Sequence, residues 1–253
     1  MTGAGAVFYR DYRQRMTNIS LVFWDLLAPV AYLVLFGTGF ERMLGTTSAV
    51  AGEPFGYIAF LIPGVLAMVT FGVAMNTSWG FFTDKDSGIV YEMLTYPITR
   101  YQILLGKIGF NLLLAFIGVV IVLGLGALAF DVPLAWRSMP MVIVVTIVAT
   151  AGWFAIFTGF AITLNRMDTF NAVASAMYIL LMFFSSMFYP LDNVPMWFRV
   201  LSYLNPMTWQ VDLLRFALLG IGHPTALIAE GIALTVFASV CLWFAVRSLN
   251  RVA

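Results

Sequence analysis

The stretch ILLGKIGFNLLLAFIGVVIVLGLGALA, residues 103–129, decides the fold class of this chain. It contains a single charged side chain, Lys107, and its hydrophobicity is continuous rather than alternating. Because about 20 apolar residues in a helix span the roughly 30 Å of hydrocarbon in a bilayer, the stretch is long enough to cross a membrane. Lipid offers no partners to backbone amides, so a spanning segment is a helix or part of a closed barrel, and continuous hydrophobicity favours the helix.

The composition extends this conclusion to the whole chain. Of the 253 residues, 62% are hydrophobic and 10% are charged, whereas soluble domains contain roughly 45–50% apolar and about 25% charged residues. We therefore expect an all-α integral membrane protein with six transmembrane helices. The six apolar runs cover residues 20–40, 57–82, 103–129, 139–163, 171–190 and 225–246.

Two further segments are predicted to lie at the membrane surface. Residues 6–19 have the pattern of an N-terminal amphipathic interfacial helix. The basic residues of this helix are Arg10, Arg13 and Arg15. Residues 191–221 are broken by Pro195 and by Asn205-Pro206 into pieces too short to span, which favours a re-entrant helical hairpin on the extracytoplasmic side, between the fifth and sixth runs.

The basic residues predict the orientation. Lys and Arg in short loops are retained on the cytoplasmic side of a membrane, and most of the 13 basic residues lie on that side if both termini are cytoplasmic, as an even number of spans requires. These residues are Arg10, Arg13, Arg15, Lys85, Arg100, Lys107, Arg166, Arg247 and Arg251. The net charge of +1 gives no basic excess that would indicate nucleic acid. No fixed-period repeat or long linker divides the chain, so residues 1–253 are expected to form a single transmembrane domain.

The loop between the second and third runs, DKDSGIVYEMLTYPITR at residues 84–100, carries the richest polar chemistry in the chain. Ile89, Val90, Met93 and Leu94 would give a short helix an apolar face, and Pro97 is expected to end that helix before the next run. Such a helix at the cytoplasmic edge could dock on a soluble partner. The alternative is an ordinary helical turn that joins two spans.

This loop and a later block resemble a known family. Residues 92–100, EMLTYPITR, followed by Lys107, resemble the cytoplasmic loop of ABC-2 type permeases, the membrane subunits of one class of ATP-binding-cassette (ABC) exporters. FSSMFYP at 184–190, LNPMT at 204–208 and VDLLR at 211–215 are similar to the late region of the same family. Within the family, the chain is most similar to drug-resistance permeases of the daunorubicin type and to nodulation-factor exporter permeases.

The resemblance implies a division of labour. A separate cytoplasmic ATPase, in two copies, binds ATP and Mg²⁺, while this chain has no G-x-x-x-x-G-K-[ST] motif and is expected to hold no cofactor and no catalytic residue. A second permease chain is expected to complete the path through a bacterial-type plasma (inner) membrane. A homodimer is the first interpretation, and a heterodimer with a different permease is the alternative. The implied cargo is an amphipathic small molecule, such as a drug or antibiotic, that is moved out of the cell. A lipid-linked cargo, a lipo-oligosaccharide or a polysaccharide is the alternative.

The resemblance also assigns roles to residues. The loop becomes the coupling helix that receives movement from the ATPase, and the N-terminal helix becomes a second contact surface, with Glu92 and Arg100 expected to make the polar contacts. The residues expected at the ATPase interface are Asp84, Lys85, Asp86, Gly88, Tyr91, Glu92, Met93, Leu94, Pro97 and Arg100.

Acidic residues inside apolar runs are costly and mark candidate functional sites. Asp25 lies near the cytoplasmic end of the first run, where Arg13 or Arg15 could neutralise it, and Glu230 lies near the outer end of the sixth run. Structural pairing is one interpretation of each carboxylate, and gating or substrate contact is the other. The candidate gating or substrate-contact residues are Asp25, Phe184, Asn205 and Glu230.

Two other classes of function compete with an ABC permease. A secondary transporter driven by protons could use Asp25 or Glu230, but no internal repeat relates two halves of the chain. An intramembrane enzyme needs a nucleophile or a base, but the chain has one histidine, His223, and no H-E-x-x-H or nucleophile-elbow motif. His223 and the single Cys241 have no metal-ligand spacing to other residues, so no metal site is expected.

Overall fold

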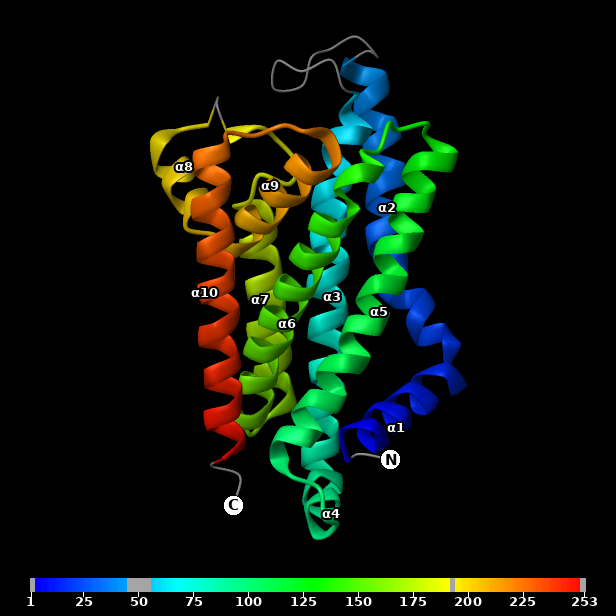
Figure 1. Ribbon diagram of the computed structural model, residues 1–253, viewed down its shortest axis with the longest axis vertical. Helices are drawn as coiled ribbons and strands as arrows, with labels where there is room; N and C mark the ends of the chain where they lie inside the picture. The colour runs from blue at the N-terminus through cyan, green and yellow to red at the C-terminus, as the bar shows by residue number, and fades with distance from the viewer. Residues whose placement is uncertain (1–2, 45–55, 192–193, 251–253) are drawn as a thin grey trace.

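The computed structural model describes residues 3–44, 56–191 and 194–250 (Figure 1). Every regular element within these ranges is a helix, so the predicted all-α fold class is confirmed. The helices are α1 (Gly3–Thr17), α2 (Ile19–Leu44), α3 (Tyr57–Asp86), α4 (Ile89–Thr95), α5 (Arg100–Ala129), the short 3-10 helix η1 (Trp136–Ser138), α6 (Met139–Thr163), α7 (Met167–Phe183), α8 (Met196–Tyr203), α9 (Pro206–Leu219) and α10 (Pro224–Leu249). Arg251, one of the basic residues assigned to the cytoplasm, lies outside the described residues.

The long helices run side by side as a bundle (Figure 1). The start of α1, the end of α10 and all of α4 lie at one end of the bundle, called the α4 end below, and α8 and α9 lie at the far end. Five helices, α2, α3, α5, α6 and α10, are long and apolar enough to cross a membrane. The sixth apolar helix, α7, has 17 residues and is shorter, so a topology of exactly six spans stays a prediction.

α7 is displaced from the apolar run that predicted it, residues 171–190. It starts at residue 167 and ends at Phe183. The Nδ2 atom of Asn205 donates to the carbonyl oxygens of Leu181 and Phe184, next to this end, at 2.7 and 3.1 Å. The last residues of the apolar run, 185–190, are therefore not helical.

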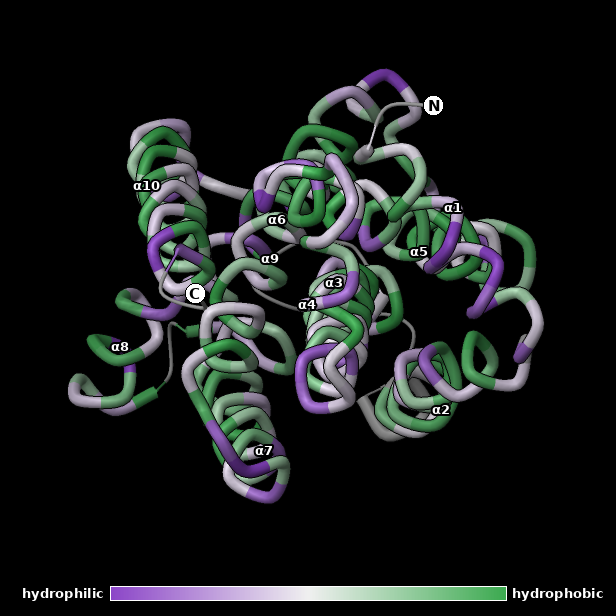
Figure 2. Tube along the Cα trace, turned by 90° about the horizontal axis from the view of Figure 1, so that it is seen from below, coloured by the Kyte–Doolittle hydropathy of each residue, from purple (hydrophilic) through white to green (hydrophobic). Residues whose placement is uncertain are grey.

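α3 lies at the centre of the bundle. Seen from below, it is surrounded by other helices (Figure 2), and it packs against α2, α5, α6 and α9. Phe71 of α3 meets Trp153 and Phe157 of α6 edge to face, with ring centroids 4.9 and 5.0 Å apart. The outer helices expose large apolar side chains such as Leu35 (68% exposed) and Ile228 (65%), as expected for a surface in contact with lipid.

The segment predicted as a hairpin, residues 191–221, contains two short helices. α8 has 8 residues and α9 has 14, so neither is long enough to span a bilayer. α9 inserts between α3, α6 and α10, and its Met207, Val211 and Leu214 are completely buried. Residues 192–193 lie outside the described part of the chain, and re-entry of the hairpin into the membrane stays a prediction.

α1 crosses the α4 end of the bundle and packs along α5 (Figure 1). It ends at Thr17, two residues before the predicted segment 6–19 does, and the chain then continues as α2. Val7 and Asp11 point into the protein, whereas Tyr9 is 53% exposed. α1 is thus two-faced as predicted, and its position at the membrane interface stays a prediction.

The contact between α1 and α5 gives a testable prediction at Gly106. A Cβ at Gly106 would lie 2.6 Å from the Ala4 carbonyl oxygen, whereas a Cβ at Gly124 of the same helix would meet nothing within 4 Å. We expect Gly106→Ala to displace α1 and to lower the free energy of unfolding by about 1–3 kcal/mol, the usual cost of overpacking. Gly124→Ala, the matched control, should leave it unchanged or slightly higher. Thermal unfolding in nanodiscs and trypsin cleavage after Arg13 measure both effects, and equal behaviour of the two variants would contradict the close contact.

Candidate functional site

The loop predicted as a coupling helix, residues 84–100, is a short helix held between two long ones. Gly88 has a φ of 79°, a left-handed conformation that favours glycine, and it turns the chain from α3 into α4. α4 ends before Pro97, as predicted. Thr99 then starts α5 with a capping box: its Oγ1 accepts from the Gln102 amide at 3.3 Å, and its own amide donates to Gln102 Oε1 at 2.9 Å.

α4 turns one face to the bundle and another outward. Val90 is completely buried, whereas Tyr91 is 53% exposed. Ile89, which the sequence placed on the inner apolar face, lies on the exposed side instead. The residues that face inward are Val90, Met93 and Leu94, and the exposed ones are Asp86, Ile89, Tyr91, Glu92, Tyr96 and Pro97. Arg100 is half-buried at the start of α5.

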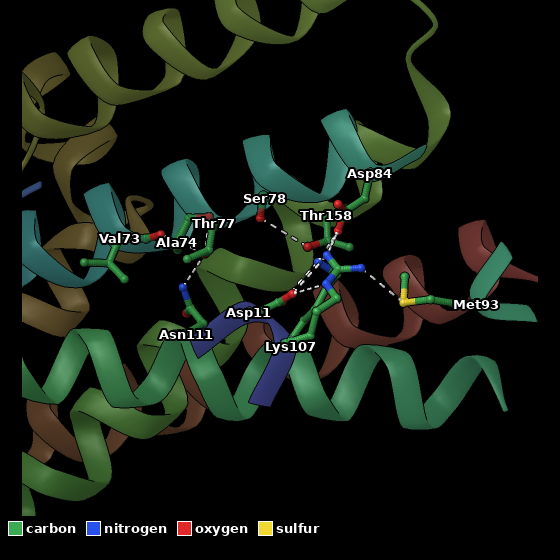
Figure 3. A network of polar contacts seen from close by, with 11 residues as sticks. Asp11, Val73, Ala74, Thr77, Ser78, Asp84, Met93, Lys107, Asn111 and Thr158 are labelled. Carbon is green, nitrogen blue, oxygen red and sulfur yellow. Dashed lines mark hydrogen bonds and ion pairs between the residues drawn. The ribbon is translucent and has the colours of Figure 1, made fainter. Parts of the chain in front are cut away.

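Asp84 lies in a buried cluster of charges at the root of α4 (Figure 3). The Nζ atom of Lys107 donates to Asp84 Oδ2 at 2.8 Å and to Asp11 Oδ2 at 3.1 Å. Arg10 also pairs with both carboxylates, and its Nη1 atom lies 3.3 Å from the sulfur of Met93. The cluster therefore joins four helices: α1, α3, α4 and α5.

The two positive and two negative side chains of this cluster balance. The side chains of Lys107, Asp84 and Asp11 are at most 10% exposed. Burial lowers the pKa of Arg10, but the carboxylates of Asp11 and Asp84 outweigh burial and raise that pKa above its ordinary value. Arg10 therefore stays charged, and loss of any one member would leave an uncompensated buried charge.

Lys85, the next residue, connects the same loop to α6. Its Nζ atom donates to the carbonyl oxygens of Ala161, Ile162 and Leu164 at 2.9, 2.9 and 2.7 Å. Carbonyl groups at a helix end have no partner within the helix, and a cation is favourable there because this is the negative end of the helix dipole. Asp84 and Lys85, both expected at the ATPase interface, thus direct their side chains to other helices of the same chain.

A second ion pair lies at the α4 end. Arg15 of α1 pairs with Asp25 of α2, and the Nδ2 atom of Asn76 in α3 donates to the other oxygen of Asp25 at 2.7 Å. Of the two partners considered for Asp25, Arg15 makes the contact, and Arg13 is exposed. Asp25 is paired within the chain, and a role in gating or substrate contact stays a prediction.

Asn205 and Phe184 lie at the far end, where they connect short helices. Asn205 Oδ1 accepts from the Met207 amide at 2.9 Å and so caps α9, while its Nδ2 bonds the end of α7. The ring of Phe184 packs on Trp197 and Phe198 of α8, with centroids 6.4 and 5.0 Å away. Both residues thus hold α7, α8 and α9 together.

Glu230 lines a cavity at the far end, together with an ion pair that the sequence analysis did not single out as a site. Asp212 and Arg215 pair at 2.7 Å within one turn of α9. Their signal in the sequence is the three-residue spacing of opposite charges inside an apolar segment. Glu230 and Asp25 form no common site among the described residues, since Asp25 contacts Arg15 and Asn76, whereas Glu230 lines the cavity beside Asp212 and Arg215. Among the described residues, no group of three His, Cys, Asp or Glu side chains could hold a metal ion.

Residues 3–219, from the start of α1 to the end of α9, match the family model described as ABC-2 type transporter. The chain belongs to the ABC-2 type transporter family. The resemblance found in the two sequence blocks is therefore confirmed. As an ABC-2 permease, the chain is a membrane transport protein, and its family implies an ABC ATPase as partner.

Three relatives of this ABC-2 permease are transport permeases by name. The ycf38 protein of Cyanophora paradoxa is 27% identical over 212 residues, which cover 83% of this chain and 70% of the relative. "Inner membrane transport permease YadH" of Escherichia coli (strain K12) is 26% identical over 200 residues, covering 78% of this chain and 76% of the relative. "Probable multidrug ABC transporter permease YbhR" of the same strain is 25% identical over 164 residues, covering 63% of this chain and 43% of the relative.

The charge cluster at the root of α4 gives the second prediction. We expect Lys107→Met to lower the free energy of unfolding by about 3 kcal/mol, because Asp11 and Asp84 would remain buried with one cation between them. Arg13→Met is the control, since this exposed cation of α1 should change stability by less than about 0.5 kcal/mol. Thermal unfolding in nanodiscs measures both.

A double-variant comparison tests whether the cluster acts as a unit. Asp84→Asn should cost less in the Lys107→Met background than in the wild-type chain, because the pair is already broken. If the losses in free energy of unfolding from the two substitutions simply added up in the double variant, the cluster would not act as a unit.

Proposed function

We propose that this chain is the permease subunit of an ABC exporter, that it spans the membrane six times, and that α4 is the coupling helix on which a separate ATPase acts. The observation that supports this most strongly is that the loop has exposed side chains on one side and side chains bonded to other helices on the other. Tyr91 and Glu92 are exposed, whereas Asp84 and Lys85 are bonded to other helices. An ordinary turn between two spans does not require such bonds to helices elsewhere in the chain.

In the proposed mechanism, the ATPase binds ATP with Mg²⁺ and closes, and α4 moves with it. The end of α3 must follow, because only Ser87 and Gly88 separate the two helices. Asp84 transmits the displacement to α5 through Lys107, and Lys85 transmits it to the end of α6. Displacement of α4 therefore shifts both α5 and α6, and this movement opens the path for the cargo.

The proposed contact surface consists of the exposed face of α4 and the neighbouring part of α1. Glu92 supplies a carboxylate and Tyr91 a half-exposed aromatic ring. Arg100 begins α5, and Arg13 is exposed on α1 at the same end of the bundle. These groups offer charges of both signs to a soluble partner.

The assembly and the cargo are proposed from the family and its named relatives. Two ATPase copies and a second copy of this chain would complete the transporter, since six helices are few to enclose a path. YadH is named an inner membrane transport permease, and YbhR is named a multidrug ABC transporter permease. These names support export of an amphipathic small molecule across a bacterial-type inner membrane.

The third prediction concerns docking. We expect Glu92→Ala to weaken the complex with the ATPase about tenfold, because a hydrogen bond to a charged group contributes about 1.5 kcal/mol. Asp168→Ala removes an exposed carboxylate from the first turn of α7, at the same end of the bundle, and is the matched control. Co-purification at graded ATPase concentrations measures the affinity.

A deletion tests the same assignment more severely. Loss of residues 86–96 should abolish both complex formation and transport-coupled ATP hydrolysis. Normal ATP-driven transport by this deletion variant would rule out α4 as the coupling helix.

The fourth prediction concerns orientation. In the proposed topology both termini and α4 are cytoplasmic. A reporter that is active only in the cytoplasm should be active when fused after residue 253, and inactive when inserted between residues 131 and 132, after α5. The reverse pattern would contradict the proposed orientation, and equal activity at both positions would contradict the six-span topology.

A further inference from the structure

A cavity of about 410 Å³ opens at the far end of the bundle, between α3, α9 and the start of α10. Sites for drug-sized ligands usually measure about 300–1,000 Å³, so this cavity falls in their range. Its described lining combines apolar side chains, such as Leu227 and Leu191, with the charged side chains of Asp212, Arg215 and Glu230. It lies at the opposite end from the proposed ATPase contact and takes no part in the coupling described above.

The positive charge in this cavity, the guanidinium group of Arg215, is already paired within the protein. Arg215 Nη1 donates to Asp212 Oδ1 at 2.7 Å, and Nη2 donates to the Ser186 carbonyl oxygen at 2.8 Å. The guanidinium carbon lies 4.1 Å from the centre of the Phe60 ring. Arg215 is 6% exposed, so its position is fixed by these contacts. It neutralises Asp212 and has its terminal nitrogens engaged.

Glu230 has no hydrogen-bonded partner of this kind, and Arg215 attracts it only from a longer distance. Its Oε2 atom is buried and accepts no hydrogen bond from any described residue. With both carboxylates ionised and His223 counted as neutral, the described lining of the cavity carries two negative charges and one positive charge, hence one net negative charge. A carboxylate in a low-dielectric site without a partner is unfavourable, and a cation that enters the cavity would relieve that cost.

We propose that this cavity binds the cationic group of the cargo, an amphipathic organic cation, with Glu230 as the counter-charge. The apolar side chains beside Glu230, Leu227 and Tyr203 among them, would contact the apolar body of the cargo. This inference rests on the proposed export function and narrows it. A lipid-linked cargo that carries a phosphate would meet the net negative charge of the cavity, whereas an organic cation is attracted by it.

The experiment compares two probes of nearly equal size and opposite charge, tetraphenylphosphonium and tetraphenylborate. Binding to the full chain in nanodiscs is measured by equilibrium dialysis, with empty nanodiscs correcting for partition into lipid. Glu230→Gln should weaken phosphonium binding at least about tenfold, a change of 1.4 kcal/mol in binding free energy. Glu230→Asp, which keeps the charge, should stay near wild type. Asp131→Asn is the matched control, because it removes an exposed carboxylate at the same end of the bundle without touching the cavity.

Two results would overturn the proposal: equal phosphonium affinity of Glu230→Gln and the wild-type chain, or tetraphenylborate binding as tightly as tetraphenylphosphonium. A further measurement needs no variant, since bound phosphonium should protect Glu230 of the wild-type chain from modification by a hydrophobic carbodiimide, and absence of protection would also overturn it. Both assays use the chain without its ATPase. Failure here therefore leaves the docking of α4 untouched, and failure of docking leaves this site untouched.

Discussion

In hydrocarbon a polar side chain has no water to bond, and α3 meets this constraint by pairing its polar side chains with different neighbouring helices. Thr70 pairs with Gln210 of α9 at 2.7 Å. Figure 3 shows two further pairs, Thr77 with Asn111 of α5 at 2.5 Å and Ser78 with Thr158 of α6 at 3.1 Å. Asp84 continues the series at the α4 end through Lys107. Because these bonds join the central helix to three neighbours, α5, α6 and α9, the placement of α3 determines that of the bundle.

The same constraint explains why the charged side chains next to the start of α4 point to a role in positioning the helices. A buried ion pair costs so much desolvation that well-packed apolar residues often give equal or greater stability. Asp84 with Lys107, and Lys85 with the end of α6, are therefore better explained by the geometry they impose than by stability. They join the end of α3 to α5 and to the end of α6, next to the place where α4 begins.

The sequence predicted those features that depend on local composition. Runs of about 20 apolar residues identified each long helix, since the thickness of the bilayer sets that length. The sequence also offered Arg13 and Arg15 as partners of Asp25, and the structure selects Arg15. The sequence did not predict contacts between segments that are far apart along the chain. Asn205 bonds carbonyl groups at the end of α7, 21 and 24 residues away, and Lys85 bonds carbonyl groups at the end of α6, 76–79 residues away. Nothing near either residue in the chain reveals these bonds.

The charged side chains at the two ends of the bundle are paired differently, and the difference matches the roles proposed for the two ends: ATPase contact at one and cargo binding at the other. At the α4 end, two cations and two carboxylates neutralise one another: Arg10, Lys107, Asp11 and Asp84. Their ion pairs join α1, α3 and α5 and leave no net charge in the cluster. At the far end, Glu230 faces a cavity with its Oε2 atom unbonded by any described residue. A buried carboxylate without a hydrogen-bonded partner lowers the stability of the folded chain, and a cation that enters the cavity from outside the fold would offset that cost.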